Sequence, residues 1–252
     1  MISMQVMWGG APVRDQAGNV VVNQSSDPKY RWGPFTTFYK GPVLDWVAWN
    51  FDGYENKPSR TDRHDSVELE GIRRTMTEVG SKYGCGRAYW EYEQGLNRFG
   101  TPMALMLLPY WTHSCIGSME GLYFEASATT PFHFAMQGEL SAQCSCAQRP
   151  ETYGMTYGEV YKGAQPDLGI RHLQMLGVKY FMATSDTMKQ AAAADPRLRK
   201  IASTGPWDIY EVSGSELVVG LDHEPAVWTN VHDNFHSWGN PAMRWYLDPT
   251  QW

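Results

Sequence analysis

The most regular hydrophobic pattern in the chain lies between Asp62 and Tyr83. Apolar residues recur at alternating steps of three and four positions, at Leu69, Ile72, Met76, Val79 and Tyr83. This spacing places them along one face of an α-helix and leaves the charged residues on the other face. Thr61 or Asp62 can cap the first turn, and Gly84 can end the last one. The pattern therefore predicts one long amphipathic helix over residues 62–83.

The C-terminal part alternates between two periodicities. Helices are expected where apolar residues keep to one side, and strands where β-branched and aromatic residues cluster. The expected elements are a helix over 167–176, a strand over 178–184, a helix over 185–195, and strands over 198–204 and 207–212. Asp167 and Ser185 are suitable N-caps, and Gly205-Pro206 is typical of a hairpin turn.

This helix-strand-helix-hairpin order predicts an α/β layer. Its core should contain Val178, Tyr180 and Met182. Two further apolar stretches, residues 216–221 and 226–231, are expected to extend the same sheet.

Residues 1–150 give weaker patterns, because glycine, proline, asparagine and aspartate interrupt them often. The strand candidates are residues 18–23, 45–55 and 86–92, the apolar stretch 101–108 is ambiguous between strand and helix, and 117–134 is expected to be irregular. The sequence thus predicts a mixed α/β (α+β) fold. It comprises a loop-rich, aromatic part over 1–150 and an α/β part over 151–252, in a single domain of 252 residues.

Composition narrows the function. The chain is globular, with 42% hydrophobic residues, and its net charge of −6 does not favour nucleic acid or anionic lipid. No run of 18 or more apolar residues is present, so no transmembrane helix is expected. We expect the chain to be a domain cut from a longer protein. No nucleotide-binding fingerprint appears, and neither a cofactor nor a metal site is expected.

Four cysteines, Cys85, Cys115, Cys144 and Cys146, are candidates for disulfides. Cys144 and Cys146 are too close in sequence to pair comfortably with each other. If the compartment is oxidising, Cys144 and Cys146 are expected to form two disulfides that reach Cys85 and Cys115, and the first expected bridge joins Cys115 to Cys144 or Cys146. Two alternatives remain: a zinc site that adds His113 to Cys115, Cys144 and Cys146, and buried free thiols.

Two pairs of carboxylates are candidates for glycoside hydrolysis. Glu91 and Glu93 would share one face of a strand, about 6–7 Å apart, which approaches the separation in inverting glycosidases. Glu120 and Glu125 would face apart on a regular strand or helix, so they suit a cleft wall better than a catalytic pair.

Histidine and the aromatic residues suggest other sites. His232 and His236 could bind a metal if both were helical. His133 is expected to be buried and hydrogen-bonded, and His172 to be a packing or surface residue. Indole rings beside carboxylates suit the apolar face and the hydroxyls of a sugar. The predicted glycan cleft therefore comprises Glu120, Tyr123, Glu125, His133, Trp90, Glu91, Trp111, Trp46 and Trp49.

Residues 84–134 and the segment "LGIRHLQMLGVKYFMATS" (Leu168–Ser185), followed by "GPWDIYEV", resemble a known group. They are similar to the extracytoplasmic domain of actinobacterial multi-span membrane proteins that look like the GT-C glycosyltransferase superfamily. The resemblance covers roughly residues 80–215.

The resemblance implies a domain on the extracytoplasmic face of the membrane, in a parent protein that assembles cell-envelope glycans from polyprenyl-linked sugars. Its partners would be the parent's transmembrane helices and an envelope polysaccharide or lipid-linked sugar. The catalytic residue of such a parent has no counterpart here, so the domain is expected to bind or scaffold and not to catalyse alone. A secreted glycan hydrolase and a structural docking module are the alternatives.

Overall fold

The structure, a computed structural model, describes residues 11–22, 29–32, 35–37, 64–99, 103–119, 128–143, 149–222, 224–225, 227–229, 231–232 and 234–252. The chain divides into two compact units. The smaller unit comprises residues 1–66 and 97–101, and the larger unit comprises 67–96 and 102–252. Each unit has its own sheet.

The described part of the smaller unit is a short antiparallel sheet in the order β1-β2-β3. Its strands are β1 (Ala11–Pro12), β2 (Tyr30–Trp32) and β3 (Phe35–Thr37). The strand expected over 18–23 is not formed in its described part, where Val20 makes an isolated bridge to Arg14. The strand expected over 45–55 lies outside the described residues.

The larger unit contains a five-stranded mixed sheet in the order β5-β4-β6-β8-β7. Its strands are β4 (Gly86–Trp90), β5 (Ile116–Ser118), β6 (Val178–Ala183), β7 (Leu198–Thr204) and β8 (Trp207–Val212). Strands β5, β4 and β6 are parallel, and β6, β8 and β7 are antiparallel. The predicted mixed α/β fold is thus confirmed, and strands from both sides of residue 150 share the sheet.

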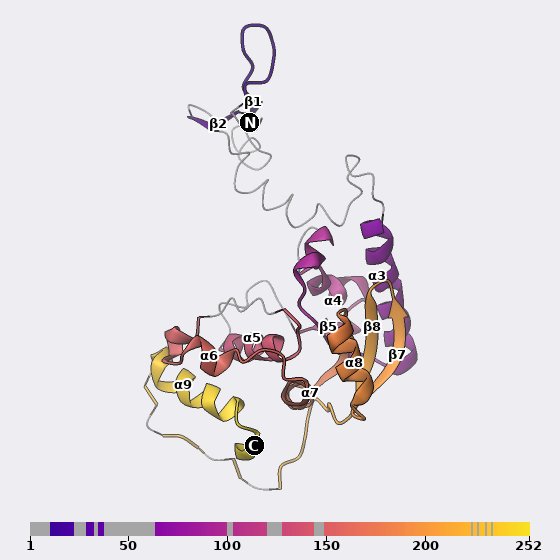
Figure 1. The fold of residues 1–252 in the computed structure, drawn as a ribbon, viewed down its shortest axis with the longest axis vertical. Helices are drawn as coiled ribbons and strands as arrows, with labels where there is room; N and C mark the ends of the chain where they lie inside the picture. Colours follow the sequence, from indigo (N-terminus) through magenta and orange to yellow (C-terminus); the bar gives the residue numbers. More distant parts are fainter. Residues whose placement is uncertain are drawn as a thin grey trace. The chain divides into compact units, whose positions relative to one another are not determined.

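Helices occupy most of the remaining described chain (Figure 1). They are α3 (His64–Tyr83), α4 (Leu108–Trp111), α5 (Thr130–Glu139), α6 (Tyr157–Val160), α7 (Pro166–Met175), α8 (Asp186–Ala194) and α9 (Phe235–Tyr246), with 3₁₀ helices η1 (Gln94–Phe99), η2 (Ala104–Leu107), η4 (Pro150–Tyr153) and η5 (Pro249–Gln251). Helices α3, α7 and α8 begin and end close to the predicted residues. Ser185 caps α8 as expected, accepting a hydrogen bond from the Met188 amide at 3.2 Å.

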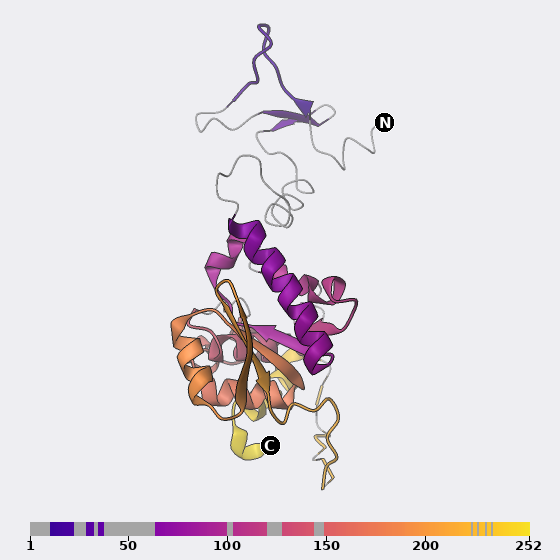
Figure 2. The same ribbon diagram turned by 90° about the vertical axis from the view of Figure 1, so that its right-hand side faces the viewer.

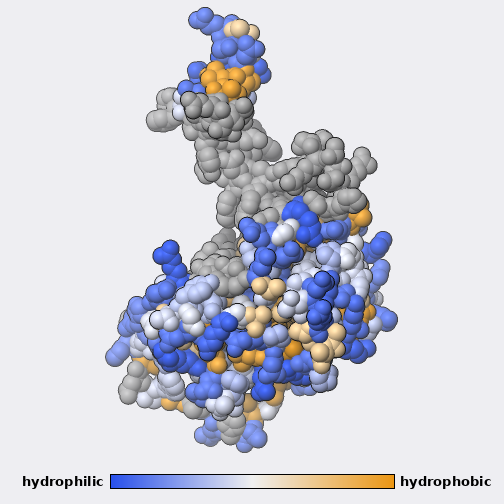
Figure 3. Space-filling view, in the orientation of Figure 1, coloured by the Kyte–Doolittle hydropathy of each residue, from blue (hydrophilic) through white to orange (hydrophobic). Residues whose placement is uncertain are grey.

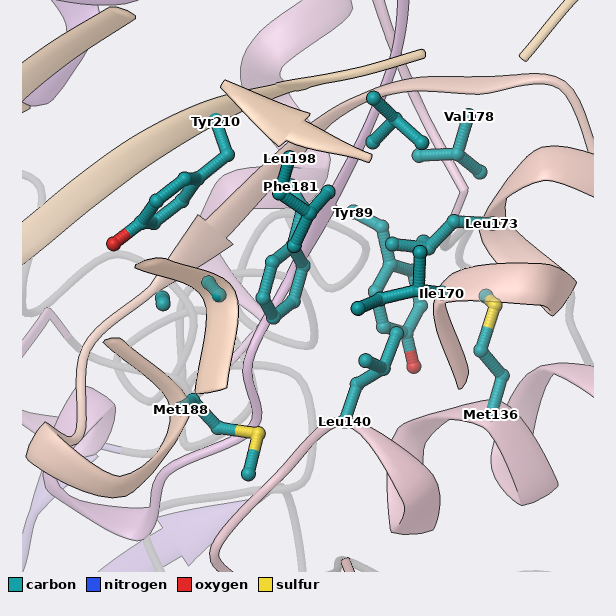
Figure 4. Packing of buried hydrophobic residues seen from close by; sticks show 13 residues of the cluster. Tyr89, Met136, Leu140, Ile170, Leu173, Val178, Phe181, Met188, Leu198 and Tyr210 are labelled. Atoms are coloured by element: carbon teal, nitrogen blue, oxygen red, sulfur yellow. The ribbon is translucent and has the colours of Figure 1, made fainter. Parts of the chain in front are cut away.

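Helices cover both faces of the sheet (Figure 2). Side chains alternate between the two faces along each strand. Tyr89, Phe181 and Tyr210 join the buried cluster under α5, α7 and α8 (Figure 4). Their neighbours Tyr180 and Met182 are equally buried outside that cluster. A sheet covered on both faces explains why β6 contains an almost continuous apolar run. The prediction that Val178, Tyr180 and Met182 are buried is confirmed.

Several segments differ from the expected elements or decide an alternative that the sequence left open. Residues 216–221 and 226–231 add no strand to the sheet in their described parts. The ambiguous stretch 101–108 forms η2 and starts α4, because Pro109 at the second position of α4 favours a helix start over a strand. The expected irregular stretch 117–134 ends in helix α5, and helix α9 has no counterpart among the predictions.

The described disulfide joins Cys85 to Cys115, with Cα atoms 4.6 Å apart. The pairing of Cys115 with Cys144 or Cys146 was therefore wrong, and so was the zinc set that required a Cys115 thiolate. Parallel pairing of β4 with β5 places Gly86 opposite Ile116, which brings the two preceding cysteines together. Cys144 and Cys146 lie outside the described residues.

Candidate functional site

The carboxyl ends of the parallel strands β4 and β6 meet at one edge of the sheet, where open α/β sheets commonly bind ligands. Here the carboxylate of Glu91 fills this edge. Its Oε2 accepts hydrogen bonds from the amides of Thr184 and Ser185, both at 2.8 Å, and from the Thr184 hydroxyl at 3.2 Å. Its Oε1 accepts one from the Ala142 amide at 3.2 Å. Glu91 therefore joins the end of β4 to Ala142, three residues after the end of α5, and to the start of α8.

This arrangement contradicts the prediction that Glu91 and Glu93 form a pair on one strand face. Strand β4 ends at Trp90, so Glu91 and Glu93 do not share a strand face. Glu91 is buried and accepts hydrogen bonds on both carboxylate oxygens, whereas Glu93 is half-buried. The second pair, Glu120 and Glu125, lies outside the described residues.

The predicted aromatic cleft is not assembled by the described residues. Trp90 is 1% exposed and His133 is buried, so neither ring can stack on a sugar. Trp111 is half-buried on α4. The other predicted members, Trp46, Trp49, Tyr123, Glu120 and Glu125, lie outside the described residues.

A different group of tryptophans lines a groove in the described larger unit. The groove has a volume of about 800 Å³, within the range of small-molecule sites. Four indoles line it: Trp228, Trp238, Trp245 and Trp252. We call it the tryptophan groove. Helix α9, the C-terminal residues and the connecting segment, residues 213–234 between β8 and α9, provide most of its walls, and Met175 of α7 also lines it.

Local hydrogen bonds fix these walls. The Asn234 side chain caps α9 by accepting from the Ser237 amide at 2.9 Å. The Ser237 hydroxyl in turn accepts from the His232 amide at 2.9 Å, which ties the connecting segment to the helix start. At the other end, the Trp245 indole N–H donates to the Gln251 carbonyl at 3.1 Å, and the Trp252 indole N–H donates to the Trp245 carbonyl at 3.0 Å. Both rings are therefore oriented from within the chain.

The groove is mainly apolar, with few polar groups. Its lining in the described part of the chain contains one carboxylate, Glu224, and the amide of Gln251, but no lysine or arginine. A smaller hollow of about 430 Å³ shares Trp228 with the groove and adds the hydroxyls of Thr229 and Ser237. The described lining thus offers flat aromatic faces and a few hydrogen-bonding groups, and it contains no cationic side chain for a phosphate or carboxylate.

A buried histidine–glutamate pair lies next to the groove, in contact with Trp252. His172 of α7 is 0% exposed, and its Nδ1 lies 2.6 Å from Oε2 of Glu139, at the end of α5. Its Nε2 lies 2.8 Å from the carbonyl oxygen of Tyr246 in α9. The imidazole ring also stacks on the Tyr246 ring, with centroids 3.6 Å apart, and contacts the ring of Trp252 at 5.0 Å.

Two polar atoms of this cluster lack a hydrogen-bond partner among the described residues: Oε1 of Glu139 and the hydroxyl of Tyr246. Burial raises the pKa of the Glu139 carboxyl above its ordinary value, while the hydrogen bond and charge of His172 act in the opposite direction. Burial also raises the pKa of the Tyr246 hydroxyl well above its ordinary value, and the nearby Glu139 adds to this effect.

Sequence reasoning expected His172 to be a packing or surface residue, and it missed this cluster. The partners are 33 and 74 residues away along the chain, so no local spacing could reveal them. The metal pair His232 and His236 is also corrected: helix α9 begins at Phe235, so His232 does not lie on the same helix. In the described residues, no three potential ligands lie close enough to hold a metal ion.

The connecting segment exposes an unusual number of aliphatic side chains. Val218 is 86% exposed and Val227 is 80% exposed, and Leu217, Val219 and Leu221 are also exposed. Figure 3 shows hydrophobic residues among the hydrophilic ones along the lower side of the larger unit. No described helix combines the length and apolarity needed to cross a membrane.

Comparisons of the chain with protein-family models, with curated proteins and with solved structures gave no match. The resemblance to extracytoplasmic domains of GT-C-like proteins therefore stays a prediction.

Proposed function

We propose that this domain binds a glycan without acting on it, at the tryptophan groove, as part of extracytoplasmic cell-envelope glycan assembly. The observation that carries the proposal is the set of four indoles that line one groove of about 800 Å³. Indole faces stack on the apolar faces of sugar rings, and a few polar groups fix the orientation of the hydroxyls. Glu224, Gln251, Thr229 and Ser237 supply such groups here.

The lining also indicates the class of glycan. With a carboxylate and no lysine or arginine among its described residues, the groove suits a neutral sugar better than a phosphorylated or acidic one. The ligand is thus the neutral part of an envelope polysaccharide or of a lipid-linked sugar. The Cys85–Cys115 disulfide supports the oxidising, extracytoplasmic compartment that this function needs. The parent chain's transmembrane helices would hold the domain there.

Binding has more support than catalysis. Glu91 has hydrogen bonds on both oxygens, so it is a poor general acid or nucleophile. Glu224 is the carboxylate that the groove lining contains in the described chain, whereas a glycosidase needs two.

A titration with neutral arabinan, galactan and mannan fragments tests the proposal, with tryptophan fluorescence as the readout. We expect dissociation constants on the order of 0.1–1 mM, because sugar hydroxyls exchange water for protein with little net gain. Trp228→Ala and Trp245→Ala should each weaken binding about tenfold or more, given the usual worth of one stacked ring. Tyr110→Ala is the matched control, because Tyr110 is an exposed aromatic residue, 78% accessible, that does not line the groove.

If no fragment changes the fluorescence at millimolar concentration, the glycan proposal is wrong. A second candidate function, docking on a membrane partner, would then take its place. The separate observation that favours docking is the exposed aliphatic surface of Leu217, Val218, Val219 and Val227.

A further inference from the structure

The contacts of the buried pair fix the number of protons that it holds. His172 Nε2 faces the carbonyl oxygen of Tyr246, which can only accept, so Nε2 carries a hydrogen. His172 Nδ1 and Glu139 Oε2 are 2.6 Å apart. One hydrogen must lie between them, because otherwise two lone pairs would face each other. The pair therefore shares one proton and is neutral overall, as imidazolium with carboxylate or as imidazole with carboxylic acid.

Loss of this shared proton would be unfavourable in the folded protein. It would leave a carboxylate against the lone pair of Nδ1, in a place where Glu139 is 1% and His172 0% exposed. Oε1 of Glu139 has no partner in the described chain that could stabilise the charge. A buried charge without compensation is costly, so the contact would loosen.

Helix α9 is the element that loss of the shared proton would affect most. Pro241 lies inside the helix, where it removes a backbone donor and disturbs the preceding turn, so α9 depends on its tertiary contacts. Tyr246 supplies two of these contacts, through its carbonyl oxygen and its stacked ring. Trp245 precedes Tyr246 directly and lines the tryptophan groove. The protonation of the pair thus reaches the groove through α9.

We propose that Glu139 and His172 form a proton-linked latch that holds helix α9 and the tryptophan groove in their binding arrangement and releases them as pH rises. The inference rests on the proposed ligand-binding function, since it concerns the same groove. Glu139 and His172 are positioning residues in this scheme and do not touch the ligand themselves.

The direction of the pH dependence follows from Glu139. Burial raises the pKa of its carboxyl, and the charges of His172 on α7 and Lys162, which follows α6, act against that rise. Tyr246 on α9 remains a neutral phenol, because burial raises its pKa well above the ordinary value. A carboxyl whose pKa is raised on folding contributes its stabilisation fully below the ordinary carboxyl range and loses it as pH rises through the raised value. The latch should therefore be closed in mild acid.

Amide hydrogen exchange tests the latch without any ligand. Protection factors of α9 are measured across pH and compared with those of α3, which does not contact the pair. In the natural chain, protection of α9 relative to α3 should fall about tenfold or more between about pH 5.5 and pH 8.5, which is the change expected when folding raises the pKa of the pair by one unit. In Glu139→Gln the relative protection should change by less than about twofold, because the amide can donate to Nδ1 but does not titrate.

A second variant keeps the test decisive if Glu139→Gln fails to fold. Glu139→Met combined with His172→Leu removes both side chains of the pair and should give an equally flat profile. A flat profile for the natural chain overturns the latch, and so does a profile of Glu139→Gln as steep as that of the natural chain. Where a glycan fragment binds, its affinity should follow the same pH dependence in the natural chain and not in Glu139→Gln. If no fragment binds at any pH, the proposed function fails, and the exchange profile alone decides the latch.

Discussion

Two carboxylates buried in the larger unit, those of Glu91 and Glu139, differ in how many hydrogen bonds they accept. Glu91 accepts hydrogen bonds on both oxygens, from three backbone amides and one hydroxyl. Glu139 uses one oxygen for His172, and its other oxygen has no partner among the described residues. A carboxylate with all its acceptors occupied is fixed as a structural joint, whereas one with a free oxygen and a titratable partner can change state.

The positions of the two carboxylates match this difference. Glu91 lies where the sheet could have bound a ligand, and its own carboxylate occupies that place. Glu139 binds His172, whose ring contacts Trp252 of the tryptophan groove, so a change of its protonation can reach the proposed binding surface. Our proposal therefore places the ligand beside the C-terminal helix α9 and not at this edge of the sheet.

The largest expected effect comes from Glu91→Ala. It leaves the amides of Ala142, Thr184 and Ser185 without their acceptor, and each unsatisfied buried donor costs about 1–3 kcal/mol. Urea denaturation should show a loss of at least about 4 kcal/mol in the free energy of unfolding. Glu93→Ala, at a half-buried neighbouring carboxylate, should lose less than about 1 kcal/mol. Similar losses in the two variants would remove the distinction drawn for Glu91.

A smaller loss is expected from His172→Leu, about 2–4 kcal/mol, because Glu139 can take up a proton once its partner is gone. Addition of Glu139→Met should recover part of that loss, since apolar side chains of similar volume often replace a buried pair without net cost. A double-mutant cycle in urea measures the coupling. If the second substitution adds its own full cost, the two side chains do not act as a pair.

The sequence predicted those features of the fold that depend on residues close to one another along the chain. The steps of three and four in residues 62–83 gave α3, and the Ser185 cap gave the start of α8, because both depend on contacts within a few residues. The disulfide partner depended on the register of β4 with β5, which no spacing contains. The valines of 216–221 favour a strand, but no strand in the described part of the chain pairs with them, and they are exposed. Gly239 and Pro241 are poor helix formers, so the sequence pattern did not predict α9 or the tryptophan groove beside it.

A moderate effect is expected from a substitution at Gly177. This glycine forms the turn between α7, which contains His172, and β6, which leads to the Thr184 donor of Glu91. Its φ of +61° lies in the left-handed region, and a Cβ there would lie 3.2 Å from the carbonyl oxygen of Glu216. Gly177→Ala should cost about 1–2 kcal/mol in thermal or urea unfolding. Gly158→Ala is the control, because it lies in helix α6 with open space around it and should be neutral or slightly stabilising. Equal outcomes for the two glycines would mean that the turn is not strained.

The smallest expected effect, and the most specific, comes from Tyr246→Phe. The phenol ring stacks on His172 and the backbone carbonyl accepts from it, and both contacts survive the substitution. The change removes only a buried hydroxyl that has no partner among the described residues. Because a hydroxyl buried without a hydrogen bond costs about 1–3 kcal/mol, its removal should raise the free energy of unfolding by up to about 1 kcal/mol after some loss of packing.

The pH profile of α9 protection should match that of the natural chain, since the Glu139–His172 pair is unchanged. A loss of more than about 1 kcal/mol, or a flattened profile, would mean that the hydroxyl bonds to the free oxygen of Glu139. The two carboxylates would then be equally well bonded, and the difference between a fixed joint and an adjustable one would disappear.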